Sequence, residues 1–137
     1  MGELAALLQK LTSTLRRIAA LEEQKTEVLI KGSVDELGAL LNAQQPLIMQ
    51  TGNLERQRIE LLTSLGIGKE DMARIARYPA PGDETELAQA YLALKDAVKE
   101  LRRLGDLNGR VLQARIDTKN HLLKILGAGI EPTTYAR

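Results

Sequence analysis

Leucine and isoleucine recur at helical spacing along this chain, even across positions that would ordinarily end a helix. A helix turns about 100° per residue, and on that count one face near the start carries Leu4, Leu8, Leu11, Leu15, Ile18 and Leu29. An apolar stripe of this kind is typical of an amphipathic helix that packs against neighbouring helices. We therefore expect a first helix over about residues 3–30.

The composition requires a core built from aliphatic side chains. Hydrophobic residues make up 44% of the 137 residues, but aromatic residues only 2%, with no Phe and no Trp. A chain of this length suits one domain of ordinary size. We predict an all-α fold, an antiparallel and coiled-coil-like bundle of long helices, in one domain over residues 1–137 that ends in a flexible tail at 128–137.

A second helix is expected to begin directly after the first. Gly32 can end a helix, and Ser33 with Glu36 has the S-x-x-E spacing of a capping box, whose side chains satisfy free backbone N–H groups. Apolar residues at helical spacing then continue to Gly66. The residues of this stripe are Leu37, Leu40, Leu41, Leu47, Ile48, Leu54, Leu61, Leu62 and Leu65.

Pro46 lies inside this stripe and would ordinarily break a helix, because it lacks an N–H and clashes with the preceding turn. However, Leu41 and Ile48 are seven residues apart, so the apolar face keeps its phase across the proline. Pro46 itself projects about 180° from Leu37, toward solvent. We predict a helix that bends at Pro46; a full break is the alternative.

Residues 66–86 should connect the second helix to the last one. Gly66 and Gly68 stop the second helix, and residues 69–77 can form a short connecting helix. Two prolines within residues 78–82 then require a loop. Asp83 with Glu86 is a second cap-like pair, so the last helix is expected to begin there.

The last helix is predicted to run over about residues 84–127, through Gly105 and Gly109. Its first row of apolar residues keeps within about 40° of Leu87 on both sides of the two glycines. A loop inserted there would have no reason to preserve this phase. The two glycines fall on the same row, where they are expected to admit a neighbouring backbone closely. The first row is Leu87, Tyr91, Leu94, Val98, Leu101, Leu112, Ile116 and Leu123.

A second apolar row begins midway along this helix, roughly 100° to 160° from the first. It consists of Leu104, Leu107, Val111, Leu122 and Ile125. One apolar row suffices for a small bundle, so the second row needs another explanation. It is buried on another side of the bundle, forms the seam of a homodimer, or binds another chain. Asn108 lies between the rows, where a polar side chain fixes the register of a helical seam unless it is simply exposed.

The sequence gives little support to catalysis or to nucleic-acid, metal and membrane binding. Lys and Arg number 19 against 18 Asp and Glu, so the net charge of +1 supplies no field to attract nucleic acid. The chain has no Cys, and its one histidine, His121, has no ligand spacing around it, so we expect a surface residue and neither a metal, a cofactor nor an enzyme. The charges from Glu55 to Glu60 are expected to be a solvated face. No stretch approaches the roughly 20 apolar residues of a membrane span, and no secretory signal is evident at the start, so we expect a cytoplasmic protein.

The pattern resembles the FlgN family of flagellar export chaperones. The resemblance lies in "LERQRIELLTSLG" near the end of the second helix, "LNGRVL" with Asn108 in the last helix, and a tail with Tyr135. It covers the chain from Leu4 to Tyr135, although Pro46 and Gly109 depart from the expected pattern. The resemblance implies a helical protein that binds hook-associated (hook-filament junction) proteins before secretion and delivers them to the type III export gate.

In this family, the C-terminal part of the long helix and the tail contact the client and the gate. Together with the second row, the resemblance assigns partner binding to Val111, Leu112, Ile116, Leu122, Leu123, Ile125, Leu126 and Tyr135. The alternative is a structural coiled-coil protein that associates with itself and carries no client. Whether the chain forms a homo-oligomer is left open by the sequence.

Overall fold

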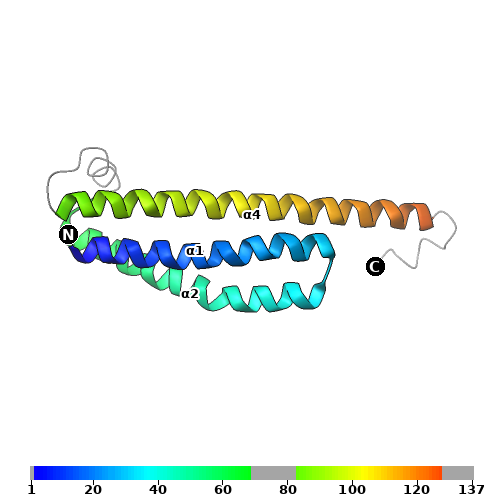
Figure 1. Cartoon of the computed structure of the whole chain (residues 1–137), viewed down its shortest axis with the longest axis horizontal. Coiled ribbons are helices and arrows are strands. Elements are labelled where there is room, and N and C mark those ends of the chain that lie inside the picture. The colour runs from blue at the N-terminus through cyan, green and yellow to red at the C-terminus, as the bar shows by residue number, and fades with distance from the viewer. Residues whose placement is uncertain (1, 69–82, 128–137) are drawn as a thin grey trace.

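The computed structural model describes residues 2–68 and 83–127. Within them lie the three helices α1 (Gly2–Lys31), α2 (Val34–Leu65) and α4 (Asp83–Gly127), which form an all-α bundle (Figure 1). Their bounds agree with the predicted spans, including a single helix through Gly105 and Gly109. α2 runs back along α1, whereas α4 runs in the same direction as α1. The predicted connecting helix at 69–77 and the tail lie outside the described residues.

A tight turn joins α1 to α2, as the capping residues predicted. Gly32 adopts a left-handed φ of 78°, which costs glycine little, and its N–H donates to the Val28 carbonyl at 2.9 Å. The Ser33 hydroxyl oxygen accepts from the Glu36 N–H at 3.3 Å. Each helix end at this turn therefore has a local capping bond, and the direction of the chain reverses within two residues.

α2 continues through Pro46, so the prediction of a full break is excluded and that of one helix is confirmed. Pro46 is exposed, while Leu47, Leu54 and Leu62 are buried. Leu41 and Ile48 are about half exposed, although the stripe placed them on the core face. α2 packs mainly on α1 and meets α4 only through a few side chains of the core clusters, so its buried face is narrower than the apolar stripe predicted.

The core lies along α1, which contacts both of the other helices. Leu4, Leu8 and Leu11 are almost fully buried and meet side chains from α2 and α4 in one cluster. Further along, Leu15 and Ile18 form a second cluster with Leu47 and Ala97. Leu94 packs against both clusters. Because Leu and Ala supply nearly all of these contacts, the core is aliphatic, as the composition required.

A buried polar cluster joins the three helices in the last third of α1. Asn108 of α4 donates through Nδ2 to the Glu22 carbonyl at 2.8 Å and to the Glu22 carboxylate at 2.6 Å. The Thr26 hydroxyl donates to Oδ1 of Asn108. Gln44 of α2 donates to the same carboxylate at 2.9 Å. Asn108 is only 5% exposed, which supports the register interpretation over that of an exposed residue.

Glu22 remains charged in this cluster. Burial alone would raise its pKa, but hydrogen bonds from Lys25, Gln44 and Asn108 outweigh burial and hold the pKa below its ordinary value of 4.5. A shift of any one helix along its axis would separate the carboxylate from a donor. The cluster therefore ties the axial positions of α1, α2 and α4 to one another.

The face of α4 that packs on α1 differs from the predicted first row. It follows a seven-residue repeat, and we call the residues of this repeat the seam: Leu87, Leu94, Leu101 and Asn108, with Ala90, Ala97, Leu104 and Val111. A strict seven-residue repeat drifts by about 20° per heptad on a straight helix, so the seam passes from the first row into the second. Leu104, assigned to the second row, is thus core at 3% exposed.

Two predictions for α4 were wrong, because the seam drifts away from the first row and because α1 ends at Lys31 before the row does. Leu112, Ile116 and Leu123 of the first row are exposed and contribute nothing to the bundle core. A side chain placed at Gly105 or Gly109 would have no neighbour within 4 Å, so neither glycine admits a close backbone. Counting at 100° per residue held the row straight, whereas the packed helices follow 3.5 residues per turn.

Candidate partner-binding groove

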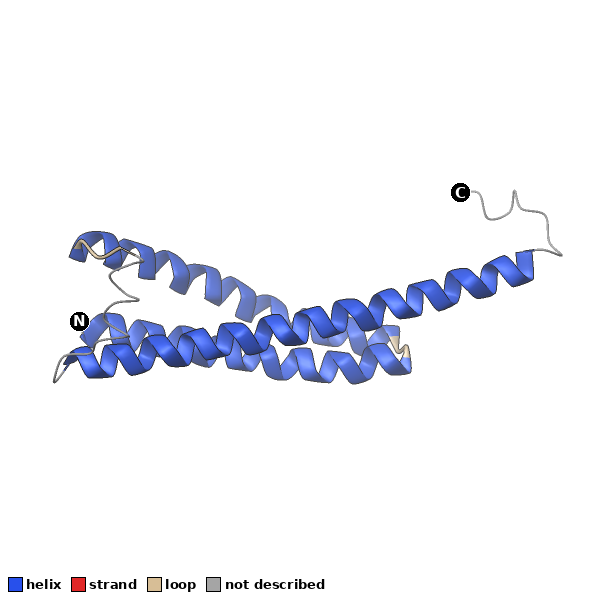
Figure 2. Cartoon of the chain, turned by 90° about the horizontal axis from the view of Figure 1, so that it is seen from above, coloured by secondary structure: helices blue, strands red, loops and turns tan. Residues whose placement is uncertain are grey.

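α4 extends well beyond the turn between α1 and α2 (Figures 1 and 2). It has 45 residues against 30 in α1, which at 1.5 Å per residue makes it longer by roughly 20 Å. α1 ends at Lys31, so the part of α4 after Val111 loses its packing neighbour. Every residue from Leu112 to Leu126 is exposed.

This projecting part of α4 carries most of the residues assigned to partner binding. Six of them are between 40% and 60% exposed: Leu112, Ile116, Leu122, Leu123, Ile125 and Leu126. Val111 is half-buried at the point where α4 leaves the bundle, and Tyr135 lies outside the described residues. A contiguous apolar surface of this kind commonly marks a site of interaction with another chain.

A groove of about 950 Å³ lies between the projecting part of α4 and the α1–α2 turn, and we call it the end groove. Its α4 wall contains the assigned residues Val111, Leu112, Ile116, Leu122 and Leu123. Its other wall, which the sequence reasoning missed, is formed by Val28, Leu29, Ile30, Gly32, Ser33, Val34 and Leu37. Ile125 and Leu126 lie outside the lining and extend the apolar surface beyond the groove.

Exposed apolar residues on both sides of the turn were the available sequence signal for this second wall. Ile30 and Val34 flank the Gly32-Ser33 turn and are 62% and 79% exposed. Residues next to a capping signal lie at a helix end, so large side chains there have few neighbours within their own hairpin. Only the placement of α4 shows that these residues face another apolar surface.

Arg115 bridges the two walls of the end groove. Its guanidinium donates to the Ile30 carbonyl at 2.7 Å, in the last turn of α1. Carbonyls there have no partner within the helix, and a cation is favourable at the C-terminal end of the helix dipole. A Cβ at Gly32 would come within 2.3 Å of this guanidinium, so a side chain there would displace Arg115, while the left-handed φ is what requires glycine. The sequence reasoning did not identify Arg115.

The charge in the end groove has one sign. Arg115 and Lys119 are the charged residues of its lining, and the lining contains neither Asp nor Glu. In residues 2–68 and 83–127, the ion pairs join Glu22 to Lys25, Glu55 to Arg58 and Glu100 to Arg103, so neither groove cation has a carboxylate partner there. The groove is therefore apolar with a cationic flank.

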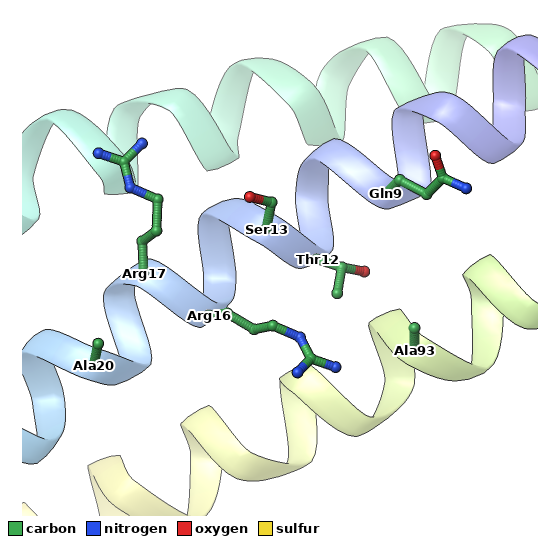
Figure 3. Close-up of a pocket in the computed structure, with 7 residues that line it drawn as sticks. All are labelled: Gln9, Thr12, Ser13, Arg16, Arg17, Ala20 and Ala93. Carbon is green, nitrogen blue, oxygen red and sulfur yellow. The ribbon is translucent and has the colours of Figure 1, made fainter.

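A second, smaller hollow of about 460 Å³ is lined by α1 residues and by Ala93 of α4 (Figure 3). Arg16 reaches toward Ala93 of α4, and Arg17 points away from it toward α2. Its one buried polar side chain, Thr12, already donates to the Leu8 carbonyl at 2.9 Å. Among the described residues no buried polar atom of this hollow lacks a partner, and its exposed arginines are typical of a solvated face.

The remaining candidate residues lie away from the end groove's lining. His121 is exposed, and the described part of the chain contains no group of three or more His, Cys, Asp or Glu residues placed to hold a metal. Glu55 accepts from Arg58 Nε at 2.9 Å, an i,i+3 pair along one helix. Both residues are half-buried, whereas Arg56 and Glu60 are exposed, so the predicted solvated face holds only in part. None of the helices described is long and apolar enough to cross a membrane.

A helical bundle with an uncovered apolar groove at one end belongs to the class of helical proteins suited to binding an amphipathic segment of another chain. Comparison with known families then identifies it: the family profile described as FlgN protein matches residues 1–137, and the chain belongs to the FlgN family. This is the family of chaperones of flagellum biogenesis whose motifs the sequence resembled. Comparisons with curated proteins and with solved structures gave no match.

Proposed function

We propose that this protein is a cytoplasmic export chaperone that binds hook-associated proteins in the end groove and delivers them to the type III export gate. The observation that carries the proposal is the uncovered apolar surface on α4 opposite the α1–α2 turn. Family membership supports the chaperone role. The exposure of Leu122 and Ile125 supports the place of binding, because these side chains contribute little to the bundle.

The test is a client-binding assay with a variant that alters only this surface. Leu122→Asp combined with Ile125→Asp puts two charges on the apolar surface, where docking would bury them at a cost of several kcal/mol. The double variant should no longer form a stoichiometric complex with the hook-associated proteins of the same organism on gel filtration. Its helical circular dichroism and melting temperature should stay near wild type, since both residues are more than half exposed.

Leu92→Asp is the matched control, because Leu92 is 49% exposed on the same helix but lies outside the lining of the end groove. The control should bind the clients normally. A double variant that unfolds would show that this part of α4 is structural. A folded double variant with full affinity would place the client elsewhere.

The competing function is a structural coiled coil that pairs with a second copy of itself. The observation in its favour is that the seven-residue repeat of the seam continues past the end of α1, through Leu122 and Ile125. Light scattering on the isolated protein separates the two. A dimer that the double variant converts to a monomer, with no client bound by wild type, would favour self-association.

A further inference from the structure

The uncovered end of α4 continues the seam that α1 occupies in the bundle. Seven residues after Asn108 comes Arg115, and seven more lead to Leu122; in the same way Val111 leads through Thr118 to Ile125. Arg115 donates to the Ile30 carbonyl in the last turn of α1, and beyond it no described helix packs on the seam. A helix laid end to end with α1 along α4 would therefore meet Leu122 and Ile125 at the spacing that α1 itself uses, with Thr118 between them and Arg115.

Charge decides what kind of helix fits this place. On a seven-residue repeat, Lys119 takes the flanking position beside the seam, where charges select the partner helix. Arg115 donates one bond to Ile30, and a guanidinium has further N–H groups for a carboxylate. With both cations free of carboxylates in the described part of the chain, an acidic residue on the incoming helix gains an ion pair without breaking one.

A second copy of the same segment is a poor occupant by this argument. Between Leu112 and Leu126 the chain carries the cations Arg115, Lys119 and Lys124 against the single anion Asp117. Two copies of this segment side by side would bring like charges together along the groove. Like charges across an interface disfavour a partner.

We propose that the end groove selects an amphipathic client helix whose apolar face is flanked by acidic residues, with carboxylates that meet Arg115 and Lys119. This inference rests on the proposed function and adds the chemistry of the client segment. The apolar walls hold the client's face, and the two cations fix its register along α4. The α1–α2 turn, as the opposite wall, gives the site a defined depth.

The test uses the full chain and two stapled helical peptides of about three heptads, with the same leucines on one face and either Glu or Lys at the flanking positions. Binding is followed by fluorescence anisotropy of a dye on the peptide. The Glu peptide should bind about tenfold more tightly than the Lys peptide in low salt. The difference should shrink in 0.5 M NaCl, because exposed charges are then screened over about 4 Å.

Lys119→Glu should reverse or abolish the preference for the Glu peptide. The residue is exposed, and no contact of its side chain is described, so the variant should fold normally. Lys99→Glu is the matched control: it makes the same charge change on an exposed position of α4 outside the groove lining and should keep the preference.

Equal affinity for the two peptides, or a preference that Lys119→Glu leaves unchanged, would overturn the proposal. The same variants are also measured against hook-associated proteins. If those proteins bind wild type and Lys119→Glu equally well, the chaperone function stands and the charge selection fails. If they do not bind wild type at all, the proposed function itself fails. A concentration-dependent dimer that excludes both peptides would make a second copy the occupant.

Discussion

Replacing Asn108 tests how much the buried polar cluster contributes to the stability of the bundle, separately from the packing of its apolar core. Asn108→Ala removes a hydrogen bond to the Glu22 carbonyl at 2.8 Å and one to the Glu22 carboxylate at 2.6 Å, both in a buried setting. A neutral bond contributes about 0.5 to 1.5 kcal/mol and one to a charged group about 1.5 to 3 kcal/mol. The expected loss of unfolding free energy is therefore about 2 to 4 kcal/mol.

Thermal denaturation followed by circular dichroism measures this loss. For a domain of this length, about 1 kcal/mol changes the melting temperature by roughly 3 to 4 °C, so Asn108→Ala should lower it by about 6 to 16 °C. The difference in melting temperature between wild type and Asn108→Ala should become smaller as the pH falls below 4.5, because protonation of Glu22 then weakens the bond from Asn108 to the Glu22 carboxylate in wild type.

Asn120→Ala provides the control, since Asn120 is an exposed asparagine on the same helix. It should leave the melting temperature within about 2 °C of wild type. An Asn108→Ala protein that melts like the Asn120→Ala protein would refute the reasoning, and would mean that the buried cluster contributes no net stability. A loss that is equally large at pH 7 and at pH 3 would show that the charge on Glu22 is not involved.

Three further substitutions test the packing and the charge of the bundle. Leu94→Ala should lower the unfolding free energy by about 2 to 3 kcal/mol, the lower part of the usual range, because Leu94 is half-buried between two core clusters. Leu92→Ala, on the exposed side of the same helix, should lower it by less than about 1 kcal/mol. Equal melting temperatures for the two variants would contradict the assigned packing face. Pro46→Ala should raise the unfolding free energy by up to about 3 kcal/mol, because it restores a backbone N–H at an exposed position; a lower denaturation midpoint would argue against the solvent-side placement. Because the pKa of Glu22 is lowered in the fold, its charged carboxylate stabilises the protein above pH 4.5, and this stabilisation is lost as the pH falls through the lowered pKa. The unfolding free energy of Glu22→Gln, measured by urea titration at each pH, should therefore decrease less in acid than that of wild type.

The extent of the helices could be predicted because local signals mark their ends. Gly32 and Ser33 supply a stop and a start within two residues, and both adopt the expected capping roles. The phase of the apolar residues also carried the chain correctly through Pro46 and through Gly105. Such signals are sufficient because each depends on neighbours within one or two turns of the same helix.

The packing of α4 could only partly be predicted, because it depends on where another helix ends. Phase along α4 cannot show that α1 stops at Lys31, so Leu112 and Ile116 were assigned to a core that does not reach them. The same limit concealed Arg115, whose partner is a carbonyl of α1 that is 85 residues away in sequence. For Asn108 the sequence left open a seam position and an exposed one, and its burial at 5% exposure favours the seam.

The assignment of α4 residues to partner binding came from the surplus of apolar surface together with family resemblance. The projecting part of α4 explains this surplus: its apolar residues continue for about four helical turns beyond the end of α1, where no described helix covers them. The opposite wall at Val34 and Leu37 needed the three-dimensional arrangement, because nothing in the sequence brings the start of α2 near the end of α4.

The two parts of α4 should drift differently as relatives diverge. Up to Val111, a substitution on the seam changes the fold's stability, so acceptable replacements at those positions are those that keep volume against α1 or preserve the bonds of Asn108. From Leu112 to Leu126 a substitution leaves the bundle nearly untouched, so selection there acts through whatever chain occupies the end groove. Changes in this part can then accumulate in step with changes in a client while the bundle stays the same. One unbroken helix would thus let a lineage exchange its clients without first having to repair its fold.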